Sequence, residues 1–252
     1  MTPQPQHTLL VTSIADEASC VMREAMLDRG GWEVDTGQGL RLYRHERTPT
    51  WMIDLDAPML GADNLDEAFE AKVLREQGGE VSNVIFLSKH AAASGQPALT
   101  VHPIGVPNPT AKAEFGGRSG KCVPPNPYMA RCLRILHEVA QERGMTEEFD
   151  ITLEATHHGN VCSGPWLDSP SMFVEIGSSE EHWGRKDAAS AWGEVSEFGL
   201  SIQADSGDIS PLKNSYKRTQ VLVGLGGGHY APKHGDLARK EGFFMASPPD
   251  RP

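Results

Sequence analysis

Four predicted strands of this 252-residue chain each end at or just before a histidine. His90 and His102 come at the ends of two of them, the pair His157 and His158 follows a third, and His229 follows the last. Imidazole side chains bind metals and transfer protons near neutral pH. Open α/β sheets bind their ligands beyond the carboxyl ends of the strands. If these strands are parallel neighbours, the histidines converge on one edge of the sheet.

Glu175 is the single acid inside the apolar run 172–176. A carboxylate buried in a strand is costly unless it is paired or bound to a cation. We therefore expect Glu175 to bind a metal or to contact a histidine, with an ion pair to a Lys or Arg as the plainer alternative. Imidazoles together with Glu175 suit Zn²⁺ that keeps an open position for water.

The segment 224–234, with the sequence GLGGGHYAPKH, follows the last predicted strand. Its three consecutive glycines permit positive φ and a close approach of the backbone to a ligand. Their N–H groups could cradle an oxyanion or a phosphate. Because His229, Tyr230 and Lys233 come directly afterwards, a binding loop is favoured over a simple connection.

The charge balance limits the possible partners. The chain has 34 Asp and Glu against 23 Lys and Arg, a formal charge of −11. Non-specific nucleic-acid binding depends on Lys and Arg that neutralise phosphates, so no DNA partner is expected. An RNA partner would need a local basic strip, for which a solvated surface is the alternative explanation. The candidates for such a strip lie in or near the segment 103–143: Lys89, Lys112, Arg118, Lys121, Arg131 and Arg134.

Two further absences in the sequence bear on location. No apolar run approaches the roughly 18 residues that span a bilayer, and the first residues lack the basic region of a secretory signal. The cysteines Cys20, Cys122, Cys132 and Cys162 form no CxxC pair, so we expect reduced thiols. These features predict a cytoplasmic protein with no membrane association.

Buried apolar runs alternate with helical patterns along the chain, which favours a mixed, mostly parallel sheet covered on both faces. Asp16 is expected to cap the first helix, Pro127 to begin a later one, and Ser178 or Ser179 to cap the next. Segment 103–127 is predicted to be a long irregular loop. We expect one domain over residues 1–252. The predicted strands are 7–14, 40–43, 51–55, 83–87, 98–102, 149–155, 172–176 and 220–225, and the helices are 17–29, 64–77, 127–143 and 180–198, the last interrupted near Gly184 and Gly193.

Six short runs, taken together, resemble the archaeal and plant type of D-aminoacyl-tRNA deacylase. They are SKH at 88–90, LTVH at 99–102, AEFGG at 113–117, EATHHG at 154–159, FVEIGSSEEHW at 173–183 and GLGGGHYAPKH at 224–234. Their order and approximate spacing also fit that family, and the resemblance extends from about residue 7 to 235.

The resemblance implies an α/β/α fold similar to peptidyl-tRNA hydrolase and phosphorylase-like folds. It implies zinc-dependent hydrolysis of the ester between a D-amino acid and the 3′ end of tRNA, as chirality proofreading and D-amino-acid detoxification, including aldehyde-modified D-aminoacyl groups. An L side chain would be rejected sterically. The expected catalytic and metal-binding residues are His157, His158, Glu175 and His229. The expected residues for the acceptor end of the tRNA are Lys89, His90, His102, Thr156, Gly226, Gly227, Gly228, Tyr230 and Lys233.

The chain also departs from the family pattern. Asn160 follows THHG where family members usually have proline, and residues 161–166 lengthen that loop. The end after about residue 235 is expected to be divergent or truncated. Three alternative functions therefore stay open. They are a different metal-dependent hydrolase or phosphorylase on the same fold, a non-catalytic tRNA- or metal-binding relative, and a protein whose histidines only hold a structural metal. The sequence also leaves open the oligomeric state, the number of metals and the range of amino acids.

Overall fold

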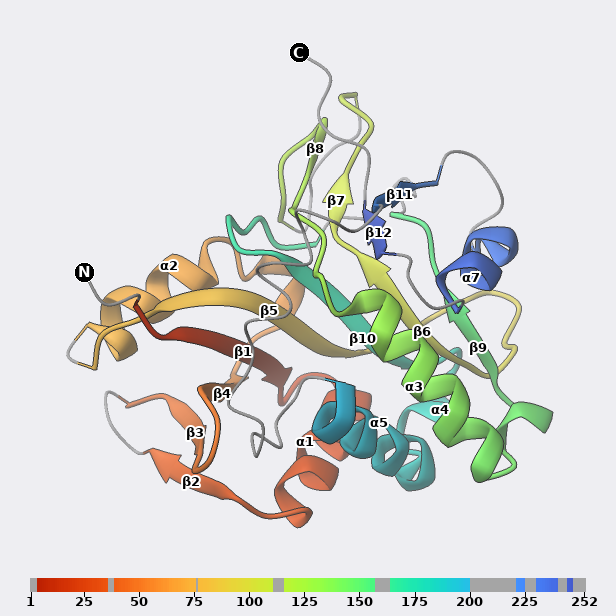
Figure 1. Cartoon of the computed structure of the whole chain (residues 1–252), viewed down its shortest axis with the longest axis horizontal. Helices are drawn as coiled ribbons and strands as arrows, with labels where there is room; N and C mark the ends of the chain where they lie inside the picture. Colours follow the sequence, from red (N-terminus) through yellow and green to blue (C-terminus); the bar gives the residue numbers. More distant parts are fainter. Residues whose placement is uncertain are drawn as a thin grey trace.

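An eight-stranded mixed sheet lies at the centre of the computed structural model (Figure 1). The structure describes residues 4–35, 39–75, 77–110, 116–156, 164–199, 221–224, 230–239 and 244–246. In spatial order the strands are β2 (Trp32–Asp35), β3 (Arg41–His45), β4 (Thr50–Leu55), β1 (Gln6–Ser13), β5 (Glu80–Lys89), β10 (Ser171–Gly177), β6 (Ala98–Pro103) and β9 (Asp150–Leu153).

The strand directions differ from those expected around the histidines. Strands β4, β1, β5 and β10 are mutually parallel, whereas β6 pairs antiparallel with β10 and parallel with β9. The carboxyl ends of β5 and β6, which carry His90 and His102, therefore point in opposite directions. The prediction that parallel strands bring these histidines to one edge is wrong. They meet instead across one face of the sheet.

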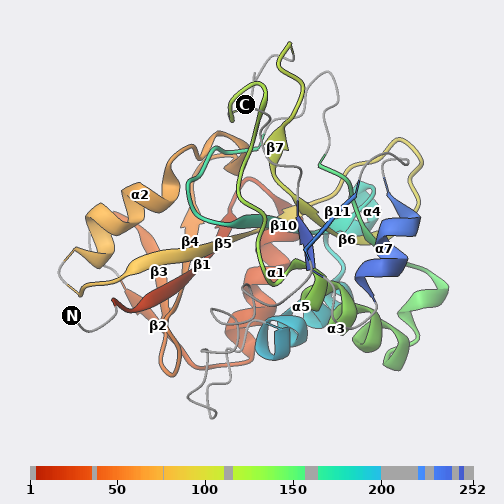
Figure 2. The same ribbon diagram turned by 45° about the horizontal axis from the view of Figure 1, so that its top comes forward.

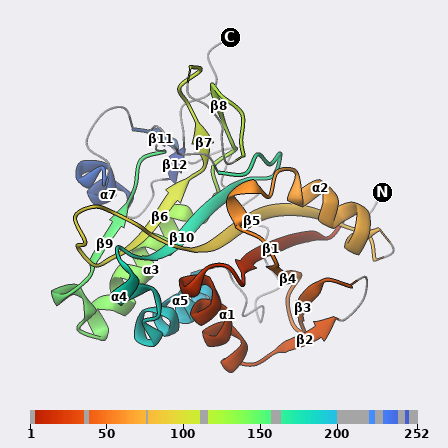
Figure 3. The same ribbon diagram turned by 180° about the vertical axis from the view of Figure 1, so that it is seen from behind.

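Three long helices cover one face of the sheet: α1 (Glu17–Asp28), α3 (Met129–Glu142) and α5 (Lys186–Gly199), with the short α4 (Glu180–Trp183) beside them (Figures 1 and 3). Their apolar side chains, including Met22, Leu133 and Trp192, form one core with inward-facing residues of the strands. Asp16 caps α1 as predicted, because its Oδ1 accepts a hydrogen bond of 3.0 Å from the Ser19 N–H.

The opposite face has a thinner cover. It consists of η2 (Met59–Gly61), α2 (Leu65–Phe69) and its π-helical continuation η3 (Glu70–Leu74), seen beside β5 in Figure 2. Phe69 and Leu74 pack in a second core with Trp51 and Phe86 from the strands. The expected α/β/α layering is therefore confirmed. Among the described residues, loops rather than a helix cover this face over β10 and β6, and the candidate site lies there.

Smaller elements complete the described part of the chain. They are β7 (Gly105–Val106), β8 (Lys121–Cys122), η4 (Met145–Glu147), β11 (Val221–Val223), α7 (Pro232–Ala238) and β12 (Phe244–Ala246). Among the described residues, no helix is both long enough and apolar enough to cross a membrane.

Several local predictions need correction. The hairpin of β7 and β8 lies within the segment predicted to be an irregular loop. Helix α3 begins at Met129 rather than at Pro127. Ser179 occupies the predicted N-cap position of α4, but its hydroxyl contacts His182 Nδ1 at 2.9 Å and not a backbone N–H of the helix. The predicted break near Gly184 separates α4 from α5, but α5 continues through Gly193. A Cβ at Gly193 would lie 3.0 Å from Cδ of Arg29, so this glycine lets α1 pack closely instead of ending the helix.

Candidate active site on one face of the sheet

Glu175 lies at the centre of the candidate site. On β10 it is in register with Ser88 of β5 and with Thr100 of β6, so these side chains share one face of the sheet. Its Oε2 accepts a hydrogen bond of 3.0 Å from Thr100 Oγ1 and lies 3.1 Å from His90 Nδ1. Its Oε1 lies 3.4 Å from His102 Nε2. The expectation that a histidine contacts this buried acid is confirmed, and two do.

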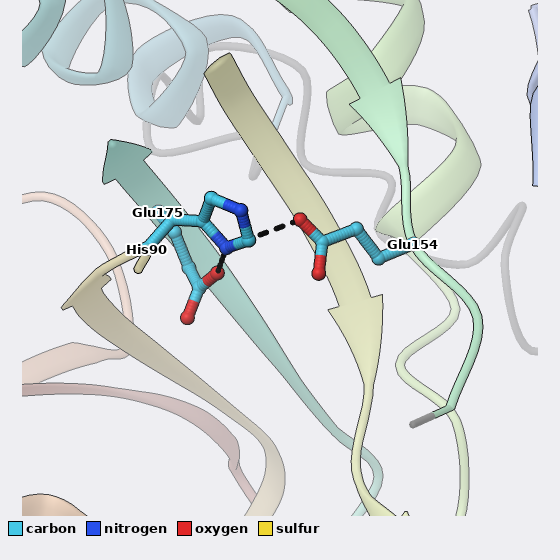
Figure 4. Close-up of side chains that lie close together, drawn as sticks. All are labelled: His90, Glu154 and Glu175. Atoms are coloured by element: carbon cyan, nitrogen blue, oxygen red, sulfur yellow. Dashed lines mark hydrogen bonds and ion pairs between the residues drawn. The ribbon is translucent and has the colours of Figure 1, made fainter. Parts of the chain in front are cut away.

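A second buried acid, Glu154, approaches from the other side of β6. It follows β9 directly, and its N–H donates to the Val101 carbonyl, which extends the strand pairing by one residue. Its Oε1 lies 3.2 Å from His90 Nδ1. Figure 4 shows the imidazole of His90 between the two carboxylates. Because carboxylates only accept hydrogen bonds, the Nδ1 atom between them carries the proton.

The position of His90 is fixed from several directions. Its carbonyl accepts a hydrogen bond of 2.7 Å from Trp183 Nε1, and its N–H donates to the Ile176 carbonyl. Its Nε2 lies 3.2 Å from the Tyr230 hydroxyl. Gly177 passes so close that a Cβ there would lie 2.3 Å from the His90 carbonyl oxygen. The imidazole is therefore held in one place before any ligand binds.

His102 is held by stacking and by its second nitrogen. Its ring lies parallel to that of Phe173, with centroids 5.1 Å apart. Nδ1 lies 3.0 Å from the Pro103 carbonyl, so it donates there and Nε2 faces Glu175. Both nitrogens therefore have acceptors, an arrangement that favours the imidazolium.

The buried charges stabilise one another. Burial alone would lower the pKa of His102, but the charge and hydrogen bond of Glu175 and the charge of Glu154 raise it to about 9. Burial opposes the charged form of Glu175 too, yet the two imidazoles hold its pKa well below the usual range. The pKa of His90 is raised despite burial, mainly by its hydrogen bond to Glu175. At neutral pH the cluster thus combines the Glu175 carboxylate with at least one imidazolium.

A cleft of about 480 Å³ opens onto this cluster. Glu175, His90 and His102 line it, whereas Glu154 lies outside the lining, behind His90. Met59, Leu60, Ile104 and Phe173 form its apolar parts, and Asp16, Ser88 and Lys89 add polar groups. A cleft with a largely apolar lining and a few convergent polar groups has the character of a small-molecule site.

The cluster also has the composition of a metal site. Ligand atoms of His90, Glu154 and Glu175 all lie within 4.8 Å of one another, and all three residues are buried. A tetrahedral zinc site with bonds of about 2.0 Å places neighbouring ligand atoms about 3.3 Å apart. The distances from His90 Nδ1 to the two carboxylates, 3.1 and 3.2 Å, match that spacing. These residues fit a divalent metal with a position left open for a further ligand.

The residues predicted from sequence divide into three groups. The structure brings together Glu175, His90, His102 and Tyr230 at the cluster. Lys89 lines the cleft, and its Nζ lies 4.3 Å from the centroid of the Trp183 ring. Thr156, two residues after Glu154, is half-buried, and Lys233 is exposed in α7. The other predicted residues, His157, His158, Gly226, Gly227, Gly228 and His229, lie outside the described residues.

Three residues of the site are not predicted from the sequence to belong to it: Glu154, Thr100 and Asp16. The argument that singled out Glu175, an acid at the end of an apolar run, applies equally to Glu154 after 149–153. Thr100 gave no signal, since threonine is ordinary in strands. Asp16 was explained fully by its role as a helix cap.

One residue of the expected basic strip has an internal role. The guanidinium of Arg134 donates to the Ala238 carbonyl at the end of α7, and Arg239 donates to the Ile151 carbonyl of β9. These contacts fasten α7, and with it the preceding Tyr230, to helix α3 and to strand β9. Arg134 therefore positions part of the site.

Comparisons with known proteins agree with this description. The sequence model of the D-aminoacyl-tRNA deacylase family matches residues 77–247. A D-aminoacyl-tRNA deacylase of Arabidopsis thaliana is 38% identical over 241 residues, which cover 94% of this chain and 73% of the relative. One of Hyperthermus butylicus is 34% identical over 194 residues, covering 77% of this chain and 62% of the relative.

A solved structure shares the fold as well. The crystal structure of a conserved protein of unknown function superimposes with a TM-score of 0.76 at 27% identity, covering 97% of this chain and 77% of that chain. The resemblance expected from the THHG, VEIGS and GGGHYAP runs is thus confirmed by sequence over most of the chain. The chain belongs to the D-aminoacyl-tRNA deacylase family.

Proposed function

We propose that this protein hydrolyses the ester bond of D-aminoacyl-tRNA and releases the free D-amino acid and tRNA, as chirality proofreading and D-amino-acid detoxification. The observation that carries the proposal is the cluster of His90, His102 and Glu175 in the cleft, in a chain whose family is named for this activity. An aminoacyl ester is already activated, so a positioned water, a proton acceptor and a stabilised oxyanion suffice.

The described residues suit these three tasks. The Glu175 carboxylate faces the cleft and can orient a water and accept a hydrogen bond from it. The protonated His102 supplies positive charge near the carbonyl oxygen of the ester, which becomes negative in the transition state. Thr100 and Tyr230 contact Glu175 and His90 and keep them in place. Because the groups are fixed before substrate binds, little reorganisation is needed.

A bound metal is part of the proposal, and we propose zinc. His90, Glu154 and Glu175 are the described residues that would hold it, in a set of nitrogen and oxygen donors that suits Zn²⁺. A zinc ion there would make a bound water more acidic and polarise the ester carbonyl. Binding would also displace the proton that His90 Nδ1 carries between the two carboxylates.

His157, His158 and His229 stay candidates for the same centre. What supports them is their place in the chain, since His157 comes three residues after Glu154 and His229 directly precedes Tyr230. Gly226, Gly227 and Gly228 precede His229 and are proposed to bind the oxyanion or the terminal adenosine with backbone N–H groups.

The tRNA is proposed to bind through its acceptor end. Lys89, Lys233 and Thr156 are the described candidates for contacts with it, and His102 and Tyr230 for contacts near the ester. With a formal charge of −11, the protein should bind tRNA modestly, with a small dependence on salt. The cytoplasm, where translation takes place, is the proposed location.

One experiment tests this function. The protein is incubated with D-Tyr-tRNA and L-Tyr-tRNA, with and without a chelator, and loss of the ester is followed. We expect hydrolysis of the D-ester, little of the L-ester, and a loss of rate with chelator that zinc restores. Equal hydrolysis of both esters, or of neither, would refute the function. Tight tRNA binding without turnover at saturating zinc would indicate a non-catalytic relative.

A further inference from the structure

The cleft contains a second carboxylate on the opposite side of Ser88 from Glu175. This is Asp16, which follows β1 and is 8% exposed. Its Oδ2 accepts hydrogen bonds from Ser88 Oγ at 3.2 Å and from the Lys89 N–H at 3.1 Å, and its Oδ1 accepts from the Ser19 N–H. The Lys89 ammonium lies over the Trp183 ring, whereas the contact of Lys89 with Asp16 is made by its backbone N–H.

Asp16 differs from the other carboxylates of the site in its partners. Glu175 and Glu154 both contact imidazoles, whereas Asp16 forms no ion pair with a cationic side chain among the residues that the structure describes. Three N–H and O–H donors contact it, and it lies at the amino end of α1, which favours a negative charge. A carboxylate accepts about four hydrogen bonds, so capacity for a further donor remains.

We propose that Asp16 binds the α-ammonium group of the aminoacyl ester. This inference rests on the proposed function. It identifies the Asp16 carboxylate as the group that binds the positive charge of the substrate next to the ester bond. The ammonium group is a cation with three donors. Among the residues that the structure describes, Asp16 is the carboxylate of the cleft that no histidine contacts.

The spacing of the two carboxylates suits this role. Asp16 bonds to Ser88, and Glu175 is in register with Ser88 on the neighbouring strand. One strand spacing plus one hydrogen bond, about 8 Å, is the least separation of the two acids, because the Glu175 carboxylate bonds to Thr100 and His102 on the side away from Ser88. In the substrate, an ammonium hydrogen bond, the two bonds from nitrogen to carbonyl carbon, the approach of a water and the hydrogen bond of that water to Glu175 span up to about 11 Å. The ammonium can therefore reach Asp16 while the ester carbonyl lies beside Glu175.

This arrangement explains how the cleft distinguishes enantiomers. The carbonyl is held at Glu175, the ammonium at Asp16, and the side chain contacts the apolar lining that includes Met59, Leu60 and Phe173. Three different groups on one tetrahedral carbon, each bound at its own place, fit only one handedness. The opposite enantiomer must give up one of the three contacts or force its side chain into a polar part of the cleft.

The test compares two substrates in two proteins. D-Phe-tRNA carries the ammonium group, and D-phenyllactyl-tRNA has a neutral hydroxyl in its place. The rate with each substrate is divided by its uncatalysed rate, which removes the intrinsic difference between the esters. Asp16→Asn is the test variant, because asparagine also caps helices well while it lacks the charge.

A matched control uses another aspartate that accepts backbone N–H groups. Asp63 Oδ1 accepts from Gly117 and Trp166, and Asp63 does not line the cleft. Asp63→Asn should leave the preference for the ammonium substrate unchanged. Circular dichroism and urea unfolding verify that all variants are folded.

We expect the wild-type protein to prefer the ammonium substrate, and Asp16→Asn to reduce that preference roughly 10- to 100-fold and to lower the ratio of D- to L-ester hydrolysis. An unchanged preference in folded Asp16→Asn would overturn the proposal. If the variant does not fold, the wild-type protein alone decides, since equal corrected rates with both substrates would also overturn it. Failure of the wild-type protein to hydrolyse D-Phe-tRNA would instead refute the function.

Discussion

His102 Nε2 lies 3.4 Å from Oε1 of Glu175, although the strands that carry these residues run in opposite directions. The contact arises because His102 is in register with Phe173, two residues before Glu175, so both side chains lie on the same face. Sheet register, rather than a shared direction of the strands, therefore assembles the site.

The first prediction concerns the metal. Glu154→Gln replaces one of the three candidate ligand carboxylates by an amide, so zinc affinity should fall at least about 10-fold. Isothermal titration of the metal-free protein measures this directly. Glu148→Gln is the control, since Glu148 is exposed and pairs with Arg185. Equal zinc affinity in Glu154→Gln and the wild-type protein would exclude Glu154 as a ligand.

The second prediction concerns the close approach at Gly177. A Cβ there would lie 2.3 Å from the carbonyl oxygen and 2.6 Å from Cβ of His90. Gly177→Ala should therefore displace His90, lower the free energy of unfolding by about 1–3 kcal/mol, and reduce deacylation. Urea unfolding and ester hydrolysis report the two effects. Gly61→Ala, which meets nothing within 4 Å, should change neither. Wild-type activity in Gly177→Ala would show that the position of His90 is not critical.

The third prediction concerns Trp183, which donates to the His90 carbonyl while its ring lies under the Lys89 ammonium. Trp183→Phe keeps a ring but removes the donor, so kcat should fall about 3- to 10-fold with little change in KM. Trp166→Phe, which changes the ring under Arg118, is the matched control and should leave kcat unchanged. A change confined to KM in Trp183→Phe would mean that Trp183 acts through the cation and not through His90.

The fourth prediction is a pH dependence of stability in the metal-free protein. The pKa of His102 is raised from 6.5 to about 9, so its contribution is complete below pH 6.5 and is lost as the pH rises through 9. The loss should be on the order of 3 kcal/mol. Glu175 has a lowered pKa, so its contribution is present above pH 4.5 and falls in acid. Urea unfolding at several pH values checks this. His102→Gln should remove most of the alkaline decline, and an unchanged decline would contradict the assignment.

The sequence predicted much of the fold and part of the site. Apolar runs identified most strands, and the acid within one of them identified Glu175, because burying a charge is costly whatever the topology. Strand direction could not be predicted in this way, since β6 looks the same whether it pairs parallel or antiparallel with β10. Contacts such as those of Thr100 and Asp16 depend on register between distant segments, which the local sequence does not encode.

The same limit explains Glu154. Glu154 lies in the EATHHG run beside two histidines, and the residue type of these histidines is the stronger local indication of a site. Its partner His90 lies 64 positions earlier in the chain, and only the packing of β9 beside β6 brings the two together. The parts of the site that depend on contacts between distant segments therefore could not be predicted from the sequence alone.

The most direct test of the central claim, that ester hydrolysis takes place at Glu175, is single-turnover hydrolysis of D-Tyr-tRNA by Glu175→Gln. The variant keeps the size of the side chain but loses the charge that His90 and His102 contact. With enzyme in excess over substrate, we predict a rate at least about 100-fold below that of the wild-type protein, with the variant still folded. A folded Glu175→Gln that releases D-tyrosine at the wild-type rate would contradict the claim.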